Sequence, residues 1–475
     1  MHMDRVNARR ADGRGWLQTL GVYREPRTLA MLFLGFSSGL PFYPAFQTMT
    51  IWLRESGVAL PLIGMVAWAT IPYSLKFLWA PVVDRMPLPF LSRLLGRRRA
   101  WLLVAQCGIA VGLLQLAASH PEAGMRRIVV WDLFLTFFAA TQDIAMDAWR
   151  IESAPVSMQG AMAAAYQVGF RIALIAGSAG ALTLAQAVNW HVSYLGIASL
   201  AAVGMVTTLL IREPQASASR ESAEREARAV AWLERRAHWP KPLQSAGAWF
   251  IGAVVSPLVD FFARYRGRAA IATVALIGAY RLTDYAEGAM TLPFFHDHGY
   301  SNEQIAWVVK IVGLTVSVLG VFLGGLLVAR WGLLRSLLVG SILMMCSSSG
   351  FAVLATTHTP TVVGLGLANG LDNLAIAIQG TVFIAYLSSL TSQKYTATQY
   401  ALFSSLYALT GKTMEGFSGF VSHATGYPLF FLYTAALSIP GLLLLLWLWH
   451  RGNAAAGLTA GALADAGGNA HAGGS

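Results

Sequence analysis

The sequence predicts an all-α polytopic membrane protein, and three observations lead to this fold class. The 475 residues are 56% hydrophobic and only 12% charged, with a mean hydropathy of +0.54, whereas ordinary soluble domains carry about 25% charged residues. Apolar segments of about 20 residues, the length of a membrane-spanning helix, recur along the chain. Several ionisable side chains lie well inside these segments, at a cost of about 2.5–3.5 kcal/mol each. Charges retained at that cost favour a transporter.

The apolar segments predict twelve membrane-spanning helices in two bundles of six. The first bundle, 28–211, contains helices at 28–53, 60–83, 98–118, 127–150, 160–187 and 190–211. The second bundle, 269–449, contains helices at 269–297, 303–329, 333–355, 360–391, 398–423 and 427–449. Each segment is near or above the length that a span requires. Gly and Pro inside the spans, at 39–41, Pro72 and Pro293, predict either bends or a fit to neighbouring helices.

The polar segments between and around the bundles are assigned next. Residues 1–27 are Arg-rich and lack the apolar core of a signal peptide, so we expect a cytoplasmic N-terminal segment. Residues 212–268 are predicted as a cytoplasmic linker that ends in an interfacial helix, because apolar Leu258 and Phe262 stand beside Asp260 and Arg264. The Ala/Gly-rich segment 450–475 is predicted to be a disordered cytoplasmic tail.

Basic residues set the expected orientation. They gather before the first helix, in the linker, and between the second and third helices, where Arg85, Arg93 and the run 97–99 lie. Positive loops stay on the cytoplasmic side, so both termini are expected in the cytoplasm. The net charge of +11 is thereby assigned to loops, and no nucleic-acid partner is expected. Cys107 and Cys346 lie in apolar runs, which disfavours a disulfide framework or a metal site.

The two bundles carry related loop motifs. APVVDR at Ala80–Arg85 and GRRR at 96–99 follow the second helix, and GGLLVARWGLLR at 324–335 follows the eighth. Small residues let helices approach closely, and the arginines hold the loop at the cytoplasmic face. The pair resembles the loop signature of the major facilitator superfamily. This resemblance implies two six-helix bundles around a central cavity that opens alternately to each side of the membrane.

Whole segments show a narrower resemblance, to the AmpG-type muropeptide permeases. The matching segments are LGFSSGLPF at 34–42, YSLKFLWAPVVDR at 73–85, TQDIAMDAWR at 141–150, GFRIALIAG at 169–177 and YTATQYALFSSL at 395–406. The resemblance implies a multi-pass protein of the bacterial inner membrane that imports anhydromuropeptides, N-acetylglucosamine-1,6-anhydro-N-acetylmuramic acid with or without peptide. It also implies roles in peptidoglycan recycling, β-lactamase induction and β-lactam resistance. The chain departs from the family pattern at Glu287, Lys412 and Glu415.

Other functions remain as alternatives. Siderophore importers and acetyl-CoA transporters share parts of the same pattern, so a same-fold transporter of a siderophore or an acyl-CoA is the second hypothesis. A membrane sensor or an intramembrane enzyme is disfavoured, because the ionisable residues are spread over both bundles and no soluble catalytic segment is apparent. The protein is expected to act as a monomer among membrane lipids.

A cytoplasmic gate is predicted from charges near the ends of the second and fourth helices. The gate candidates are Lys76, Asp84, Arg85, Asp147 and Arg150. The spacing of Asp143, Asp147 and Arg150 places them on adjoining faces of one helix. They would pair across the closed gate and separate on opening, or else form a permanent ion pair at a helix end.

Substrate contacts are predicted nearer the membrane midplane. An anhydromuropeptide carries carboxylates, for which Arg171, Arg281 and Lys412 are the candidate partners. The alternative is neutralisation of these cations by Asp284, Asp372 or Glu415. Polar or aromatic contacts to sugar or amide groups are predicted for three further residues, which could equally serve packing: Gln142, Tyr43 and Tyr166.

Import of an anion against an inside-negative potential costs about 2.3 kcal/mol per charge per 100 mV, so a coupled cation is expected. A proton is the natural choice, because a buried carboxyl group can bind and release it. The candidates are Asp284, Glu287, Asp372, Glu415 and Asp143, and the alternative is an Asp–Arg pair that never titrates. No phosphate-binding loop for nucleotide hydrolysis is present in the sequence, so a proton gradient and no cofactor is expected.

Overall fold

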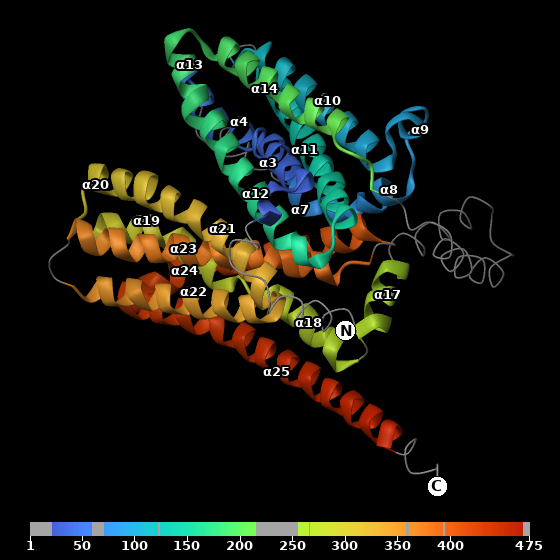
Figure 1. Cartoon of the computed structure of the whole chain (residues 1–475). Coiled ribbons are helices and arrows are strands. Elements are labelled where there is room, and N and C mark those ends of the chain that lie inside the picture. Colours follow the sequence, from blue (N-terminus) through green and yellow to red (C-terminus); the bar gives the residue numbers. More distant parts are fainter. Residues whose placement is uncertain are drawn as a thin grey trace, which may run out of the picture.

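The computed structural model describes residues 21–58, 71–121, 124–214, 255–265, 267–357, 361–392 and 395–468, and the elements within these ranges are helical (Figure 1). The first half contains η1 (Gly21–Arg24), α3 (Pro26–Gly39), α4 (Phe42–Ala45), α5 (Gln47–Glu55), α7 (Ile71–Leu75), η3 (Lys76–Leu78), α8 (Ala80–Arg85), α9 (Leu91–Leu95), α10 (Arg97–Ala117), α11 (Met125–Ser153), α12 (Val156–Ile175), η5 (Ala176–Gly180), α13 (Ala181–Ala187) and α14 (Trp190–Leu210). The second half contains α17 (Ser256–Tyr265), α18 (Arg268–Ala279), α19 (Leu282–Asp297), α20 (Asn302–Trp307), η7 (Val308–Gly313), α21 (Leu314–Trp331), α22 (Leu333–Thr356), α23 (Val362–Leu390), α24 (Thr396–Thr425) and α25 (Tyr427–Gly468).

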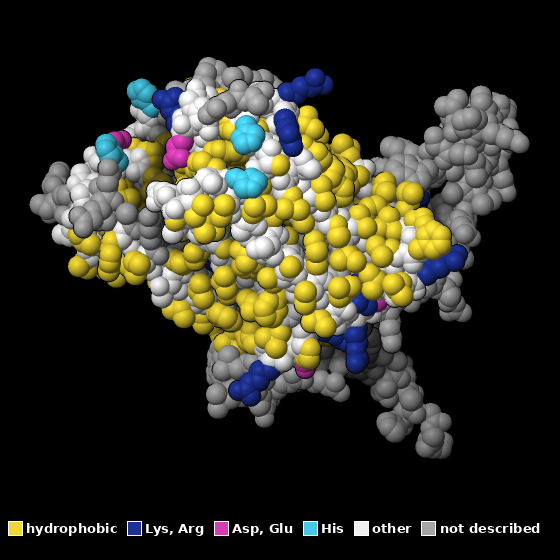
Figure 2. All heavy atoms as spheres, turned by 90° about the horizontal axis from the view of Figure 1, so that it is seen from above, with side chains coloured by type: hydrophobic (Ala, Val, Ile, Leu, Met, Phe, Trp, Pro, Cys, Tyr) yellow, Lys and Arg dark blue, Asp and Glu magenta, His cyan; other side chains and the backbone are white. Residues whose placement is uncertain are grey.

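Membrane-crossing helices dominate this architecture. Within the described ranges, nine helical stretches are long and apolar enough to cross a bilayer by length and composition. Large apolar side chains remain exposed on them, and Figure 2 shows hydrophobic side chains over most of one face, with charged side chains mainly at its borders. Such an exterior is stable in lipid and would aggregate in water. Residues 60–70 of the predicted second helix, 60–83, lie outside the described residues.

The predicted first helix, 28–53, and seventh helix, 269–297, are each divided. The first is divided into α3, α4 and α5: Pro41 removes one backbone donor, and the chain breaks again at Phe46, next to which the carbonyl oxygen of Pro44 accepts from the Tyr194 hydroxyl at 2.9 Å. The seventh is divided into α18 and α19, with the break at Tyr280 and Arg281. The carbonyl oxygen of Tyr280 accepts from the Gln379 side chain at 3.0 Å. Side chains of neighbouring helices thus satisfy the freed backbone groups, as membrane interiors require.

Other elements also differ from the prediction. The fifth and eighth helices contain π-helical turns, η5 and η7, and the helix continues through Pro293 in α19. The segment 450–475, predicted to be disordered, continues α25 as far as Gly468. Its many alanines have the highest helix propensity, which favours extension of the last span over disorder. Only α17, Ser256–Tyr265, represents the predicted interfacial helix within the described residues.

The two halves meet at one end and diverge at the other (Figure 1). At the closed end, where α8 and the first turns of α24 lie, Ala397 and Ala401 of α24 join a buried cluster with Ala80, Ile144 and Trp149 of the first half. Further along, α12 packs against α21 and α23. Toward the open end, where α13 and α20 lie, the halves separate in the view of Figure 1. The structure is therefore that of a two-bundle protein with one end closed.

Glycines bring α3 and α12 into backbone contact. A Cβ atom at Gly169 would lie 1.8 Å from the carbonyl oxygen of Leu32, and one at Gly35 would lie 2.2 Å from that of Tyr166. Both obstacles are backbone atoms on a packed helix, so a side-chain rotation cannot relieve them. The close crossing of α3 and α12 therefore requires glycine at these positions.

We expect Gly169→Ala to lower the thermal unfolding midpoint of the purified protein, with a stability cost of about 1–3 kcal/mol from overpacking. Gly366→Ala in α23 is the matched control, because a Cβ atom there meets nothing within 4 Å. Unfolding in detergent, followed by the loss of the monodisperse peak on heating, measures both variants. Equal midpoints for the two would contradict the close crossing.

Candidate transport site

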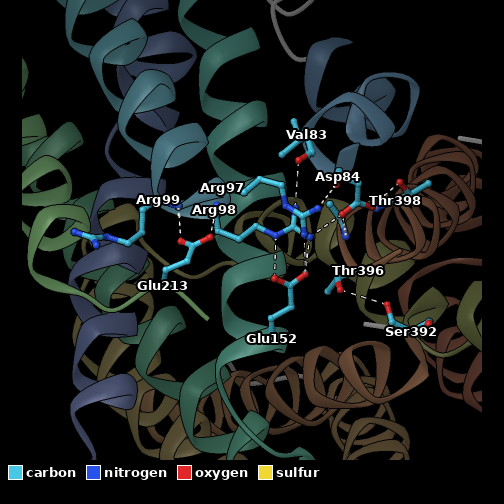
Figure 3. Close-up of polar contacts among 11 residues, drawn as sticks. Val83, Asp84, Arg97, Arg98, Arg99, Glu152, Glu213, Ser392, Thr396 and Thr398 are labelled. Carbon is cyan, nitrogen blue, oxygen red and sulfur yellow. Dashed lines mark hydrogen bonds and ion pairs between the residues drawn. The ribbon is translucent and has the colours of Figure 1, made fainter. Parts of the chain in front are cut away.

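A buried ion network lies at the closed end (Figure 3). The Arg98 guanidinium, at the start of α10, contacts Asp84 of α8 at 2.8 Å and Glu152 of α11 at 2.5 and 3.0 Å. The side chains of Arg98 and Asp84 are almost fully buried. Glu213 accepts from the backbone N–H groups of Arg98 and Arg99, at 2.8 and 3.1 Å, and so caps α10. One arginine thereby joins α8, α10 and α11 of the first half.

Asp84 extends this network across to the second half. Its carboxylate accepts from the backbone N–H groups of Ala397 (3.1 Å) and Thr398 (2.7 Å) and from the Thr398 hydroxyl (2.7 Å). These groups belong to the first turn of α24, where unsatisfied N–H groups and the helix dipole favour an anion. Asp84 is therefore the acidic residue that holds the second half against the first.

Asp84 follows the predicted span 60–83, at the end of α8. Burial alone would raise the pKa of Asp84, but the Arg98 guanidinium and the hydrogen bonds from Thr398 outweigh burial and hold the pKa below its ordinary value. A lowered carboxyl pKa contributes stability above the ordinary pKa, and that stability is lost only as the pH falls through the lowered value. Asp84 is thus ionised at neutral pH, and mild acidification leaves its contacts in place.

Arg150 makes a second contact between the halves. Its guanidinium pairs with Asp147 at 3.1 Å, donates to the Ser388 hydroxyl of α23 at 2.7 Å, and lies 5.3 Å from the ring centroid of Tyr400 in α24. Lys76, in η3, forms no ion pair with any residue that the structure describes. The predicted gate residues Asp84, Asp147 and Arg150 therefore lie at the closed end, beside Arg85 at the end of α8.

The candidates on α11, α12 and α4 contact residues of the first half. Gln142 is buried and accepts from Ser37 at 2.8 Å. Asp143 accepts from Ser38 at 2.6 Å, and the Ser38 and Tyr166 hydroxyls are 3.3 Å apart. Tyr43 is half-buried in α4, with its ring edge-on to Phe42. These side chains connect α3, α11 and α12.

Arg171 lies on the face of α12 that contacts the second half. Gly160, Ala164, Gln167 and Arg171 follow one another at helical spacing along one face of α12. The first three contact the second half: Gly160 lies against α21, Ala164 lies in a cluster with residues of α21 and α23, and Gln167 donates to Thr381 at 2.5 Å. Arg171 comes one turn further toward the open end. It is half-buried and has no carboxylate partner among the described residues.

Lys412 and Glu415 occupy the corresponding position on α24. Ala397 and Ala401, which contact the first half, lie on the same face of α24 as Lys412 and Glu415, because the 11 residues from Ala401 to Lys412 make about three helical turns. Both charged side chains are exposed, and they form no ion pair with each other or with another described residue. Basic groups thus lie beyond the contact region on both halves.

Arg281 is held differently, at the break between α18 and α19. Its guanidinium forms a very short ion pair with Asp284 and lies 5.6 and 5.8 Å from the ring centroids of Tyr285 and Tyr407. About a fifth of the Arg281 side chain is exposed, at 21%. Asp284 therefore neutralises Arg281, while two aromatic rings and part of the guanidinium remain available for contact.

Two acids are buried inside the second half. Glu287 of α19 and Asp372 of α23 are 1% and 6% exposed. Glu287 accepts a short hydrogen bond from Ser348, and Asp372 accepts from the adjacent Ser347 at 3.1 Å. The second Glu287 oxygen has no hydrogen-bond partner, and neither carboxyl group forms an ion pair within the described part of the chain. One stretch of α22 therefore holds two carboxyl groups without a counter-ion.

Several of these residues were missed by sequence reasoning. Arg98 was counted only as a loop charge, and Thr398 and Ser388 carry no charge that would single them out. Asp132, a buried acid in α11 with an unpartnered oxygen, was also missed, although an acid inside the predicted span 127–150 was a readable signal.

Within the described residues, no group of three His, Cys, Asp or Glu side chains could hold a metal ion.

The family sequence model described as Major Facilitator Superfamily matches residues 28–412. Solved structures agree on the fold: FucP in the outward conformation gives a TM-score of 0.63 at 14% identity, covering 90% of this chain and 99% of that one. The proton:xylose symporter XylE gives 0.59 at 14% identity, covering 89% and 94%. The fold and the charged residues between its halves thus define a membrane transporter of this superfamily.

Comparison with relatives of similar sequence identifies the family within this superfamily. The anhydromuropeptide permease of Escherichia coli K12 is 31% identical over 431 residues, which cover 90% of this chain and 81% of that protein. A transporter named AmpG 4 of Rickettsia conorii is 31% identical over 430 residues, which cover 90% of this chain and 97% of that protein. The chain belongs to the AmpG family of the major facilitator superfamily.

Proposed function

We propose that this protein imports anhydromuropeptides across the bacterial inner membrane by proton-coupled alternating access, for peptidoglycan recycling and β-lactamase induction. The observation that carries the substrate class is the position of Arg171, a cation without a described carboxylate partner, one turn beyond Gln167, which contacts Thr381 of the second half. The name of the Escherichia coli relative supports a muropeptide as the anion. A siderophore or an acyl-CoA is the alternative.

The ligand would lie between the facing surfaces of the two halves. Arg171 of α12 and Lys412 of α24 offer positive charge from opposite halves, and the planar guanidinium of Arg171 can bind a carboxylate through two parallel hydrogen bonds. Tyr285 and Tyr407, beside Arg281, offer aromatic faces to the sugar rings. A ligand bound from both sides can draw the halves together at the open end, as alternating access requires.

Proton coupling is assigned to the pair Glu287 and Asp372. Of the five candidate acids, Asp284 has Arg281 as counter-ion, Glu415 is exposed, and Asp143 is only partly buried. Glu287 and Asp372 alone are buried acids on neighbouring serines of α22 without an ion-pair partner among the described residues. Two such groups cannot both remain ionised in an apolar interior, so together they hold a proton whose binding depends on access to one side.

The closed end is proposed to face the cytoplasm. It carries the run Arg97–Arg99 together with Arg330 and Arg335, which end and begin helices of the second half. Positive residues at one face of a membrane protein mark its cytoplasmic side. The conformation described here is then the one open to the periplasm, and the contacts of Asp84 and Arg150 must break for release into the cytoplasm.

Uptake into proteoliposomes tests this function. Radiolabelled anhydro-disaccharide, with and without peptide, is presented under an inward proton gradient, and again after an uncoupler has collapsed the gradient. Accumulation that depends on the gradient supports a coupled importer. Absence of saturable uptake by folded protein would remove the muropeptide assignment, and the same vesicles then receive ferric siderophore or acyl-CoA.

Arg171→Ala is expected to raise the KM for the anhydro-disaccharide about tenfold or more, since a hydrogen bond to a charged group contributes about 1.5–3 kcal/mol. Arg93→Ala is the matched control, because Arg93 is an exposed arginine of α9 at the closed end. Initial uptake rates over a range of substrate concentrations measure both variants. Equal KM values would place Arg171 outside the substrate path.

A further inference from the structure

The short helix α17 lies beside the closed end (Figure 1). Its two faces differ in burial. Phe261 and Pro257 are buried against the bundle, whereas Val255, Leu258, Val259 and Phe262 are exposed. The exposed residues are spaced three and four apart, so they form one apolar stripe. A stripe of this kind on a short helix fits the boundary between lipid headgroups and acyl chains.

The chain leads directly from α17 into a membrane span. Only positions 266 and 267 separate Tyr265 from α18, and Gly267 has a φ of +54°, which lets the chain turn sharply. The apolar stripe therefore lies close to the surface of the bilayer that α18 enters. This continuity identifies the occupant of the stripe as membrane lipid.

The buried face of α17 is attached to the first turns of α24. Gln399 of α24 donates to the carbonyl oxygen of Pro257 at 2.8 Å and to Asp260 at 3.2 Å, and accepts from Arg264 at 2.9 Å. One helical turn further along α24, Phe403 packs against Phe261 with ring centroids 5.2 Å apart. Polar and apolar contacts thus hold α17 and α24 together.

The opposite face of these same turns binds the first half. Thr398, next to Gln399, donates to Asp84, and Ala401 lies in the buried cluster with residues of the first half. The start of α24 is thus enclosed between α17 on one face and Asp84 on the other. A shift of α17 would move the N–H groups that Asp84 binds.

We propose that α17 is a membrane-anchored support of the closed end: its apolar stripe lies in the lipid boundary, and Gln399 and Phe403 transmit its position to the turn of α24 that binds Asp84. The support stabilises the closed end, so weakening either attachment favours its opening. This inference rests on the alternating access proposed above, but not on the identity of the substrate.

Distances between spin labels in lipid nanodiscs test the proposal. Labels on Leu94→Cys of α9 and Arg335→Cys of α22 report the separation of the halves, since both side chains are exposed and belong to opposite halves at the closed end. Cys107 and Cys346 are replaced by serine in this background, because both are free and exposed. Asp84→Asn is the reference variant and is expected to increase the long-distance population.

Two variants of α17 and its attachment are compared with that reference. Gln399→Leu removes the polar attachment, and the double substitution Leu258→Ser with Phe262→Ser removes the lipid anchor. Each is expected to lower the ratio of short to long distances about fivefold, in line with the loss of hydrogen bonds or apolar burial. Phe262→Leu and Val353→Ser are matched controls, because the first keeps the stripe apolar and the second alters an exposed apolar residue of α22.

The outcomes separate the two proposals. If Asp84→Asn opens the closed end but the α17 variants do not, the proposal that α17 supports the closed end is rejected. The proposal that Asp84 holds the closed end together is retained. If Asp84→Asn leaves the distances unchanged, the gate and the support that acts through it both fail. Gln399→Leu combined with Asp84→Asn should add little to Asp84→Asn alone, and full additivity would contradict transmission through α24.

Discussion

Arg98→Ala is expected to be the most destabilising single substitution at the closed end. It leaves the buried Asp84 carboxylate without its arginine and leaves Glu152 with only the 4.0 Å contact to Arg97, and loss of one partner from a buried ion pair costs about 3–5 kcal/mol. The thermal unfolding midpoint of the purified protein should fall accordingly, and helix content at low temperature should be retained. Light scattering during heating, together with far-UV circular dichroism, measures both.

Two variants serve as comparisons for Arg98→Ala. Arg98→Lys keeps the charge but not the planar fork that reaches both carboxylates, so an intermediate midpoint is expected. Arg93→Ala removes an equal charge from the exposed surface of α9 and should leave the midpoint unchanged. If Arg98→Ala and Arg93→Ala unfold at the same temperature, the buried network does not hold the closed end.

Glu287→Gln is expected to abolish gradient-driven accumulation while exchange of labelled for unlabelled substrate continues. The glutamine keeps the size and the contact with Ser348, but it cannot bind and release a proton. Uptake under an imposed proton gradient should therefore fall to the level seen with an uncoupler. Counterflow in the absence of a gradient should remain within about twofold of the parent, since the substrate contacts are intact.

Glu25→Gln provides the control for this substitution, because Glu25 is an exposed acid before α3 and should couple normally. Asp372→Asn should reproduce the loss, and the double variant should be no worse than either single one, because the two carboxyl groups act as one site. If Glu287→Gln accumulates substrate to the parent level, Glu287 is not the proton-binding residue, and another acid must bind the coupled proton. Loss of counterflow as well as accumulation would instead indicate damage to the substrate site.

The spans could be predicted from sequence because apolar length is a local property. Helix ends fall within a few residues of expectation for α10, α14 and α22. The break at Tyr280 could not be predicted, because it depends on Gln379 and Thr410, which reach the freed carbonyl groups from distant parts of the chain. Where a helix is interrupted depends on tertiary contacts with distant residues, whereas the length of an apolar span depends only on consecutive residues.

The sequence indicates which residues at the candidate site carry charge, but not which residues they contact. Asp84 and Arg150 stand out as charges at helix ends, yet their partners across the closed end, Thr398 and Ser388, are neutral residues more than 200 positions away. The spacing of Lys412 and Glu415 allowed a local pair that the structure does not form. Charge is visible in a sequence, but the backbone N–H groups that bind it are not.

The contact between α12 and the second half is made largely of small residues, with Gly160 and Ala164 meeting Gly325 and Ala377. Glycine and alanine have no side-chain rotamers to lose on packing. Forming or separating this contact therefore changes the side-chain entropy very little. In the alternating access proposed above, this surface would separate and reassemble at little cost in side-chain entropy, so that polar contacts, which substitution can change, would contribute to the balance between the two states.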